Sequence, residues 1–176
     1  MKSAPVLLLV LVPVASAIGR PVTAENVQDV IRILRAIPDP SRKELDAAGS
    51  DVDRALTLVV EDSKADETLR QRAARSLGRY PSPSVRGLLT GMMNSRLHAT
   101  GLRTAAMIGL ARGFREEAFH DLKPFLIDTS PAVRAGAATA MGEVGGPRAR
   151  ALLLDSIAHE SDIDVRLTME EALKKL

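Results

Sequence analysis

The chain has no cysteine and no tryptophan among its 176 residues, and aromatic residues make up only 2% of it. Without cysteine there can be no disulfide, no thiolate chemistry and no cysteine-linked lipid anchor. With so few aromatic rings, a hydrophobic core must be built from aliphatic side chains and alanine. Alanine and leucine are strong helix formers, so the composition predicts an all-α protein.

The sequence also lacks the short motifs of common enzyme classes. It contains no G-x-S-x-G and no H-E-x-x-H, and 145–147 is not continued as a phosphate-binding loop. Glu117 and His120 have the spacing of half a di-metal site, but no second copy of that motif exists. The polar group at 159–162 is interpreted as a solvated helix end rather than as a cation site. We therefore predict no catalytic residue, no metal site and no cofactor.

The N-terminus predicts a secretory signal peptide over residues 1–17. Lys2 precedes an apolar run at 4–14, and Ala15-Ser16-Ala17 fits a cleavage site. A membrane anchor is the alternative, but the apolar stretch with its flank is only 15 residues long, whereas a spanning helix needs about 20. We expect a mature domain at 18–176, without a transmembrane segment, in the periplasm or secreted.

Four arginines recur at spacings of 33, 31 and 32 residues, namely Arg70, Arg103, Arg134 and Arg166. Seven positions after each stands a large aliphatic residue, namely Leu77, Leu110, Met141 and Leu173. A fixed period of this length is typical of stacked helical repeats. We call the helices that carry these arginines the signature helices.

Helix boundaries follow from caps and breakers. Thr23 predicts the N-cap of a helix that ends before Pro38, and 41–49 can hold one further turn. Ser50 with Asp53 predicts a capping box for the next helix. Further helices are predicted at about 66–78, 84–93 and 99–112, around 119–126 with a kink at Pro124, at 131–145, around 152–157, and from Asp162 to the C-terminus.

These elements predict about four antiparallel helix pairs of about 32 residues, each with the signature helix first. Neither helix of a pair can bury its apolar stripe alone, so the pairs are expected to stack into a right-handed alpha-solenoid with one continuous core.

The run Leu126–Arg134, with Ala137-Ala138 and Met141-Gly142 after it, resembles a HEAT repeat of the short bacterial kind, also seen in phycobilisome-lyase-type proteins. The resemblance covers about 50–176, and 22–49 more weakly. It implies that the four repeat arginines are structural and bridge to acidic groups of adjacent turns. It also implies a convex side lined by the first helix of each pair and a concave binding side lined by the second.

Charge is distributed unevenly along the chain. Between Thr68 and Arg115 there are nine arginines and no acidic residue, namely Arg70, Arg72, Arg75, Arg79, Arg86, Arg96, Arg103, Arg112 and Arg115. This acid-free block predicts a positive middle that could steer an anionic partner. Within it, Arg72, Arg75 and Arg79 are interpreted as a solvated stripe on the convex side.

A basic residue also stands two positions before the first predicted buried leucine of each second helix. These are Arg54, Arg86, His120 and Arg150. Two residues turn a helix by about 200°, so these side chains should face away from the core. We predict a basic row for binding along the concave side, with unrelated exposed residues as the alternative.

Three functions fit these patterns. The leading one is an exported, non-enzymatic scaffold that binds a protein or peptide, favouring an acidic one, on its concave face. The second is binding of polyanions or anionic lipid headgroups by the acid-free block. The third is a HEAT-like lyase-type enzyme, for which no site residue can be matched. Nucleic acid is not expected as a partner outside the cytoplasm, and the oligomeric state is left open.

Overall fold

The structure is a computed structural model that describes residues 22–176. Helices fill most of this part of the chain and it contains no strand, which confirms the all-α class. The predicted signal peptide at 1–17 lies outside the described residues, as does the start of the predicted mature domain. Within 22–176, no helix is both long and apolar enough to cross a membrane.

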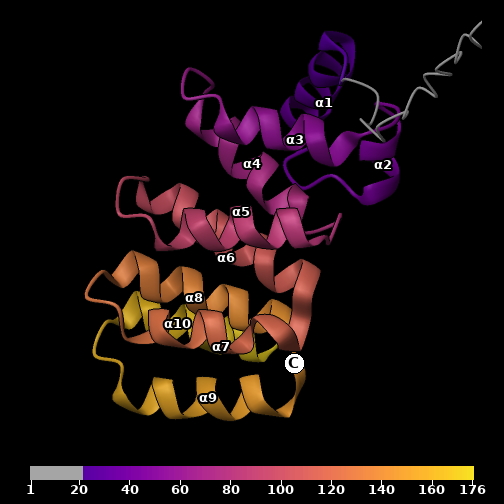
Figure 1. Cartoon of the computed structure of the whole chain (residues 1–176). Coiled ribbons are helices and arrows are strands. Elements are labelled where there is room, and N and C mark those ends of the chain that lie inside the picture. Colours follow the sequence, from indigo (N-terminus) through magenta and orange to yellow (C-terminus); the bar gives the residue numbers. More distant parts are fainter. Residues whose placement is uncertain (1–21) are drawn as a thin grey trace, which may run out of the picture.

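The helices follow one another along a single stack from α1 to α10 (Figure 1). They are α1 (Ala24–Ala36), α2 (Arg42–Asp46), α3 (Val52–Glu61), α4 (Glu67–Leu77), α5 (Pro83–Asn94), α6 (Thr100–Phe114), α7 (Phe119–Leu122), α8 (Pro131–Val144), α9 (Gly146–His159) and α10 (Ile163–Leu173). Short 3₁₀ segments flank α7, namely η1 (Arg115–Ala118) before it and η2 (Lys123–Ile127) after it.

Local signals set most helix starts. The Thr23 hydroxyl accepts a hydrogen bond from the backbone N–H of Asn26, which confirms the predicted cap of α1. Ser41 and Glu44 form a capping box that opens α2, the further turn that was expected. The predicted capping box at Ser50 is wrong. Asp51 precedes α3 in a left-handed conformation, with φ at 57°, and its side chain makes no capping bond.

The kink predicted at Pro124 is confirmed and is larger than expected. Instead of one bent helix, the chain forms four residues of α-helix between two 3₁₀ segments. Proline has no N–H to donate and its ring blocks the carbonyl one turn earlier, so a regular helix cannot pass through it. The α7 region is therefore shorter and more irregular than its counterparts α5 and α9.

The four predicted helix pairs are present, but each is shifted by one helix. Of its neighbours along the chain, every signature helix packs more on the helix before it than on any helix directly after it, giving the pairs α3/α4, α5/α6, α7–η2/α8 and α9/α10. Turn signals could not distinguish the two arrangements, because the loops before and after a signature helix are similarly short. The arrangement depends instead on which neighbouring helix the apolar stripe of each helix faces.

The signature helices α4, α6, α8 and α10 form one closely packed layer. Small residues permit this contact. A Cβ atom at Gly78 would overlap the carbonyl oxygen of Gly109, and one at Gly109 would overlap that of Ala74. The remaining helices α3, α5, α7 and α9 form a second layer and make few contacts with one another.

This unequal spacing reverses the predicted sidedness. In a curved stack the more closely spaced layer lies on the inside of the curve, so the signature helices line the concave side. We call them the inner layer, and α3, α5, α7 and α9 the outer layer. The expectation that the second helices line the concave side is therefore wrong, because the backbone contacts between small residues lie on the signature helices.

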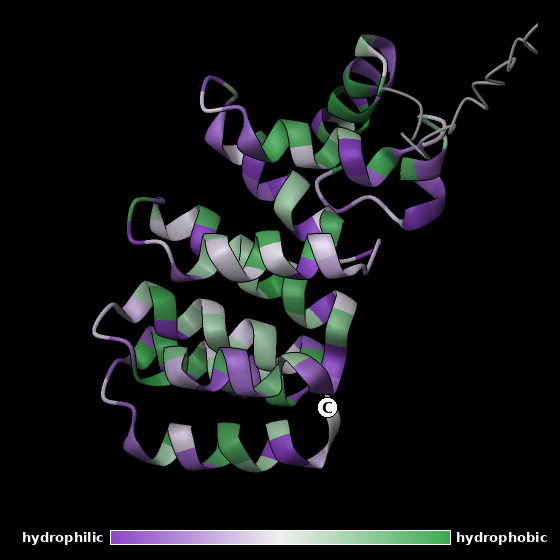
Figure 2. Cartoon of the chain, viewed as in Figure 1, coloured by the Kyte–Doolittle hydropathy of each residue, from purple (hydrophilic) through white to green (hydrophobic). Residues whose placement is uncertain are grey.

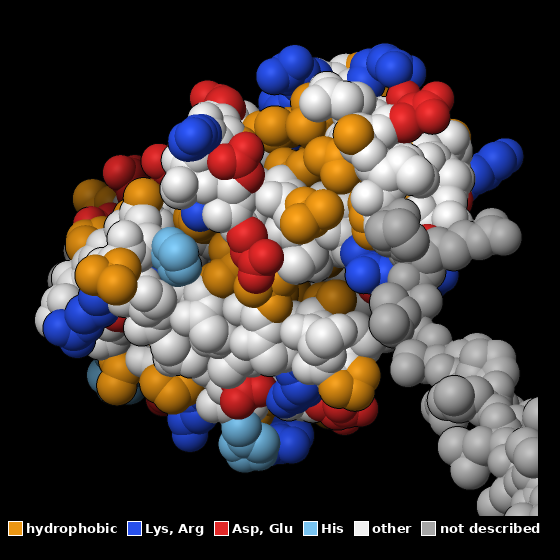
Figure 3. Space-filling model, turned by 45° about the horizontal axis from the view of Figure 1, so that its top comes forward, with side chains coloured by type: hydrophobic (Ala, Val, Ile, Leu, Met, Phe, Trp, Pro, Cys, Tyr) orange, Lys and Arg blue, Asp and Glu red, His pale blue; other side chains and the backbone are white. Residues whose placement is uncertain are grey.

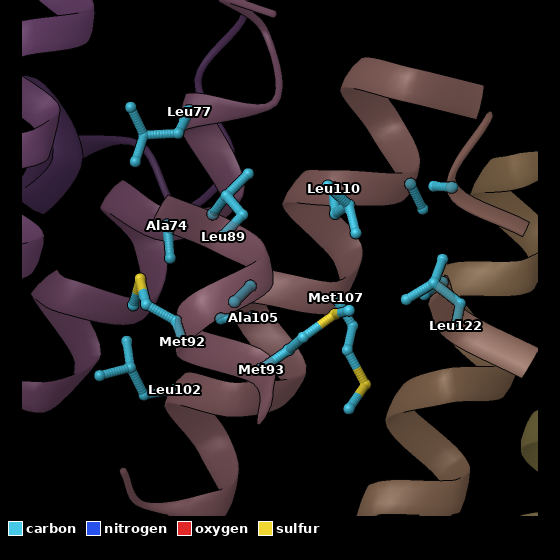
Figure 4. Close-up of a cluster of buried hydrophobic side chains, with 14 of the residues drawn as sticks. Ala74, Leu77, Leu89, Met92, Met93, Leu102, Ala105, Met107, Leu110 and Leu122 are labelled. Atoms are coloured by element: carbon cyan, nitrogen blue, oxygen red, sulfur yellow. The ribbon is translucent and has the colours of Figure 1, made fainter. Parts of the chain in front are cut away.

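The core runs without interruption between the two layers. Figure 4 shows its central part, where side chains of α4, α5, α6 and α7 meet, among them Leu89, Met107 and Leu122. Hydrophobic residues run along the helices, whereas many connecting loops are hydrophilic (Figure 2). Alanine and methionine supply much of the buried surface, as expected for a chain with so few aromatic rings.

Candidate functional site

The first two repeat arginines link the layers within a helix pair. The Nε–H of Arg70 donates to the carbonyl of Val60 at 2.8 Å, and that of Arg103 donates to Met93 at 3.0 Å. Both acceptors lie in the last turn of the preceding helix, where carbonyls lack intrahelical partners and carry the negative end of the dipole. In the last repeat the Nε of Arg166 is buried and has no hydrogen-bond partner among the described residues.

Arg134 also links two consecutive pairs. Its Nε donates to Glu160 Oε2 at 2.6 Å and its Nη2 to Oε1 at 2.8 Å, while Nη1 donates to the carbonyl of Asp128 at 2.9 Å. The Glu160 side chain is only 5% exposed. The hydrogen bonds from Arg134 hold the pKa of Glu160 below its ordinary value, and they outweigh the opposing effect of burial.

A second charged network joins residues far apart in the sequence. Asp39 accepts from Arg79 at 2.9 Å and from Arg112 at 2.8 Å, and Arg112 reaches Glu143 at 3.4 Å. Burial by itself raises the pKa of Asp39, but the charges and hydrogen bonds of Arg112 and Arg79 lower it further than burial raises it. This network connects the segment after α1 with the turn that follows α4 and with α6 and α8.

The acid-free block is therefore extensively paired. Seven of its nine arginines bond to carboxylates or backbone carbonyls, namely Arg70, Arg72, Arg79, Arg86, Arg103, Arg112 and Arg115. On the face in Figure 3, basic side chains lie interspersed with acidic ones. The interpretation of Arg72 and Arg79 as a solvated convex stripe is wrong, because Arg72 donates to the carbonyl of Leu34 at 2.7 Å and Arg79 bonds Asp39.

The structure does not bring the predicted basic row together. Arg54, His120 and Arg150 are exposed, whereas Arg86 is half-buried and donates to Asp121 at 2.6 Å. Arg54 lines a groove of about 680 Å³ between α3 and α5, and Arg86 lines one of about 600 Å³ at the start of α5. His120 lines a third groove, and Arg150 lines none of the three. All four lie on outer-layer helices, so none is on the concave side.

The third groove, between α7–η2 and α9, has a volume of about 770 Å³. We call it the α7–α9 groove. Its walls include His120, Lys123 and Ile127 on one side and Leu152, Asp155 and His159 on the other. Arg134 and Glu160 lie at the end where the hairpin loops are. The volume is within the range of pockets that bind ligands or peptide side chains.

His120 marks the opposite end of this groove. Its Nε2 lies 3.1 Å from Nη2 of Arg148, whose guanidinium stacks 4.5 Å from the ring centroid of Phe119. A guanidinium can only donate, so the imidazole nitrogen is the acceptor in this contact. Across 22–176, no three histidine, aspartate or glutamate side chains are grouped so as to hold a metal ion.

Residues 98–174, which include both walls of the α7–α9 groove, match the family profile of HEAT repeats. This part of the chain therefore consists of HEAT repeats. No curated protein matches the chain. The same architecture continues before the matched segment, because Arg70 in α4 makes the same bond to its preceding helix as Arg103 does in α6.

The α7–α9 groove was not predicted from the sequence. The predicted basic row contains His120 but neither Lys123 nor Asp155, because it was defined by basic residues at one helix position. Two features of the sequence could have indicated this groove. Pro124 interrupts an outer-layer helix, and Ile127 is an apolar residue at the very end of that element, where it is 85% exposed.

Proposed function

We propose that this protein is an exported scaffold that binds a protein or peptide partner and has no catalytic activity of its own. HEAT repeats typically serve as protein-interaction scaffolds, and residues 98–174 match that family. The observation that carries the proposal is the α7–α9 groove, which has apolar side chains on both walls and charged groups at its rims. The location of this groove supports a binding surface on the outer layer.

Binding of polyanions by the acid-free block has less support. Among its nine arginines only Arg75 and Arg96 have side chains without an ion pair or hydrogen bond to the rest of the described chain. They lie on α4 and in the loop before α6, which are different repeats. A headgroup or polyanion would have to break existing ion pairs or hydrogen bonds to backbone carbonyls to recruit more arginines.

The test is site-specific crosslinking in the native cell. A photoreactive amino acid is placed at Ile127 in the α7–α9 groove, and in separate strains at Leu97, an equally accessible loop residue, and at Thr104 on the inner layer. We expect one protein to be crosslinked in high yield from position 127 alone. Crosslinks from position 104 alone would show that the binding surface lies on the concave side. An absence of protein crosslinks from all three positions would overturn the scaffold function.

Export is tested separately by cell fractionation and intact mass. The mature chain is expected in the envelope or the medium with Ile18 at its N-terminus. A cytoplasmic chain that retains Met1 or Lys2 would contradict export without affecting the binding proposal.

A further inference from the structure

The α7–α9 groove has features that specify what kind of partner fits it. On the first wall, His120, Lys123, Pro124 and Ile127 line the groove in order toward the hairpin loops. These positions come from the irregular α7–η2 segment. Pro124 and the strongly exposed Ile127 provide apolar surface, and Lys123 is the charged group in the middle of the wall.

The second wall is one face of α9. Leu152, Asp155, Ser156 and His159 line it at helical spacing over two turns. Leu152 is half-buried and continues the apolar floor formed by the buried Leu126, while Asp155 is exposed at mid-groove. At mid-groove each wall thus combines apolar surface with one exposed charged side chain, and the two charges have opposite signs.

Neither of these charges is neutralised by a strong partner. Lys123 makes no ion pair with any residue in 22–176, and Asp155 has only His159, at 3.9 Å between two exposed side chains. The two rims do not pair with each other across the groove. A partner can therefore gain an ion pair on each side, and Ile127 supplies apolar surface that residues 22–176 leave uncovered.

The secondary structure of the walls decides the conformation of the occupant. Both walls are helical, so most of their backbone N–H and C=O groups are bonded internally and there is no strand edge to extend. An extended peptide would leave its own backbone groups without backbone partners, whereas a helix satisfies its own. Side chains of a helix can also pack between those of two neighbouring helices.

We propose that the α7–α9 groove binds an amphipathic helix of a partner protein. The apolar stripe of that helix packs on Leu126, Ile127 and Leu152, an acidic flank faces Lys123, and a basic flank faces Asp155. This inference rests on the proposed scaffold function and specifies the partner's chemistry.

The test uses three synthetic helical peptides of about four turns that share one leucine stripe. The first carries glutamate on one flank and lysine on the other, the second glutamate on both, and the third lysine on both. Binding to the full chain is measured by fluorescence anisotropy at pH 8 and low salt. Because a helix can dock in either direction, flank composition rather than flank order is the informative variable.

We expect the wild-type chain to prefer the mixed peptide by about threefold to tenfold, the size of one or two surface ion pairs. Lys123→Glu makes both rims acidic and should shift the preference to the all-lysine peptide. Asp155→Lys makes both rims basic and should shift it to the all-glutamate peptide. Ile127→Glu should weaken binding of the mixed peptide at least tenfold, whereas Leu97→Glu, an exposed leucine outside the groove, should leave it unchanged. Circular dichroism and melting curves confirm that each variant is folded.

Three results would overturn the inference. They are no binding of any peptide at 1 mM, the same peptide preference in all charge variants, and equal effects of Ile127→Glu and Leu97→Glu. Analytical ultracentrifugation tests for a different occupant. If the wild-type chain is a dimer and Ile127→Glu makes it monomeric, a second copy of the chain covers the groove. Failure of the peptides together with a cellular crosslink elsewhere on the chain would reject this groove and leave the scaffold function standing.

Discussion

Arg134 and Glu160 lie in consecutive helix pairs and are joined by two hydrogen bonds, at 2.6 and 2.8 Å. Glu160 follows α9 directly, in the loop that leads into α10, while Arg134 belongs to α8. The Glu160 carboxylate also accepts from the backbone N–H of Asp162, the residue that caps α10. One carboxylate therefore orients the loop of the last pair and attaches it to the pair before.

The first prediction concerns the stability of this ion pair. Glu160→Gln should lower the free energy of unfolding by about 2–4 kcal/mol, because it leaves the largely buried Arg134 guanidinium without its counter-charge. Asp155→Asn is the matched control on the same helix pair. Its side chain is exposed, so the change should stay within about 0.5 kcal/mol. Urea denaturation of both variants measures the difference, and equal stabilities would contradict the structural role of the pair.

The second prediction is a loss of stability in acid. The carboxyls of Asp39 and Glu160 have pKa values below their ordinary values of 3.8 and 4.5. The unfolded chain therefore binds more protons than the folded chain in this range, and stability rises with pH through it. The free energy of unfolding should begin to fall as the pH drops below about 4.5 and continue to fall toward the folded-state pKa values.

Glu160→Gln tests the assignment of this acid effect. The variant has no carboxyl to titrate at position 160, so its stability should fall less steeply with decreasing pH than that of the wild type. Identical slopes between pH 3 and pH 6 would show that other groups cause the effect.

The third prediction compares two glycines in helices of different layers. Gly109→Ala places a Cβ against the carbonyl of Ala74 and should cost about 1–3 kcal/mol by overpacking. Gly87→Ala on α5 meets nothing within 4 Å, so it should gain up to about 1 kcal/mol from the better helix propensity of alanine. Thermal melting of the two variants should therefore show shifts of opposite sign. A tolerated alanine at 109 would mean that the inner layer is less closely packed than described.

The fourth prediction concerns Asp39. Its side chain is 52% exposed, so the bonds to Arg79 and Arg112 are partly screened by solvent. Asp39→Asn should lower the free energy of unfolding by about 1 kcal/mol at low salt and by less at 1 M salt. Asp29→Asn is the control, because its pair with the exposed Arg32 lies within one helix. If both variants respond alike, the network does not connect α1 to the stack.

The sequence was sufficient to predict the repeat and most of the helix boundaries. The arginine spacing repeats in every pair, and caps such as Thr23 and breakers such as Pro124 act within a few residues of where they stand. The capping box at Ser50 was wrong because two positive φ values, at Gly49 and Asp51, redirect the chain just before α3.

Features that depend on distant residues could not be predicted in this way. Asp39 lies 73 residues from Arg112 in the sequence. Because its acidic partners are this distant, the pairing of arginines in the acid-free block could not be predicted. The sidedness of the layers depends on which glycines meet, such as Gly78 and Gly109, rather than on where helices begin. The α7–α9 groove depends in turn on the wider spacing of the outer layer.

The two layers also differ in mechanical stiffness. In the inner layer, helix backbones meet through residues without long side chains, so the distance between neighbours such as Gly78 and Gly109 cannot shrink and has little room to vary. Outer-layer helices have few contacts with one another and can tilt about that fixed spine. A helix inserted between α7 and α9 would thus act as a wedge that changes the bend of the whole stack, and the curvature of the protein would report whether the groove is filled.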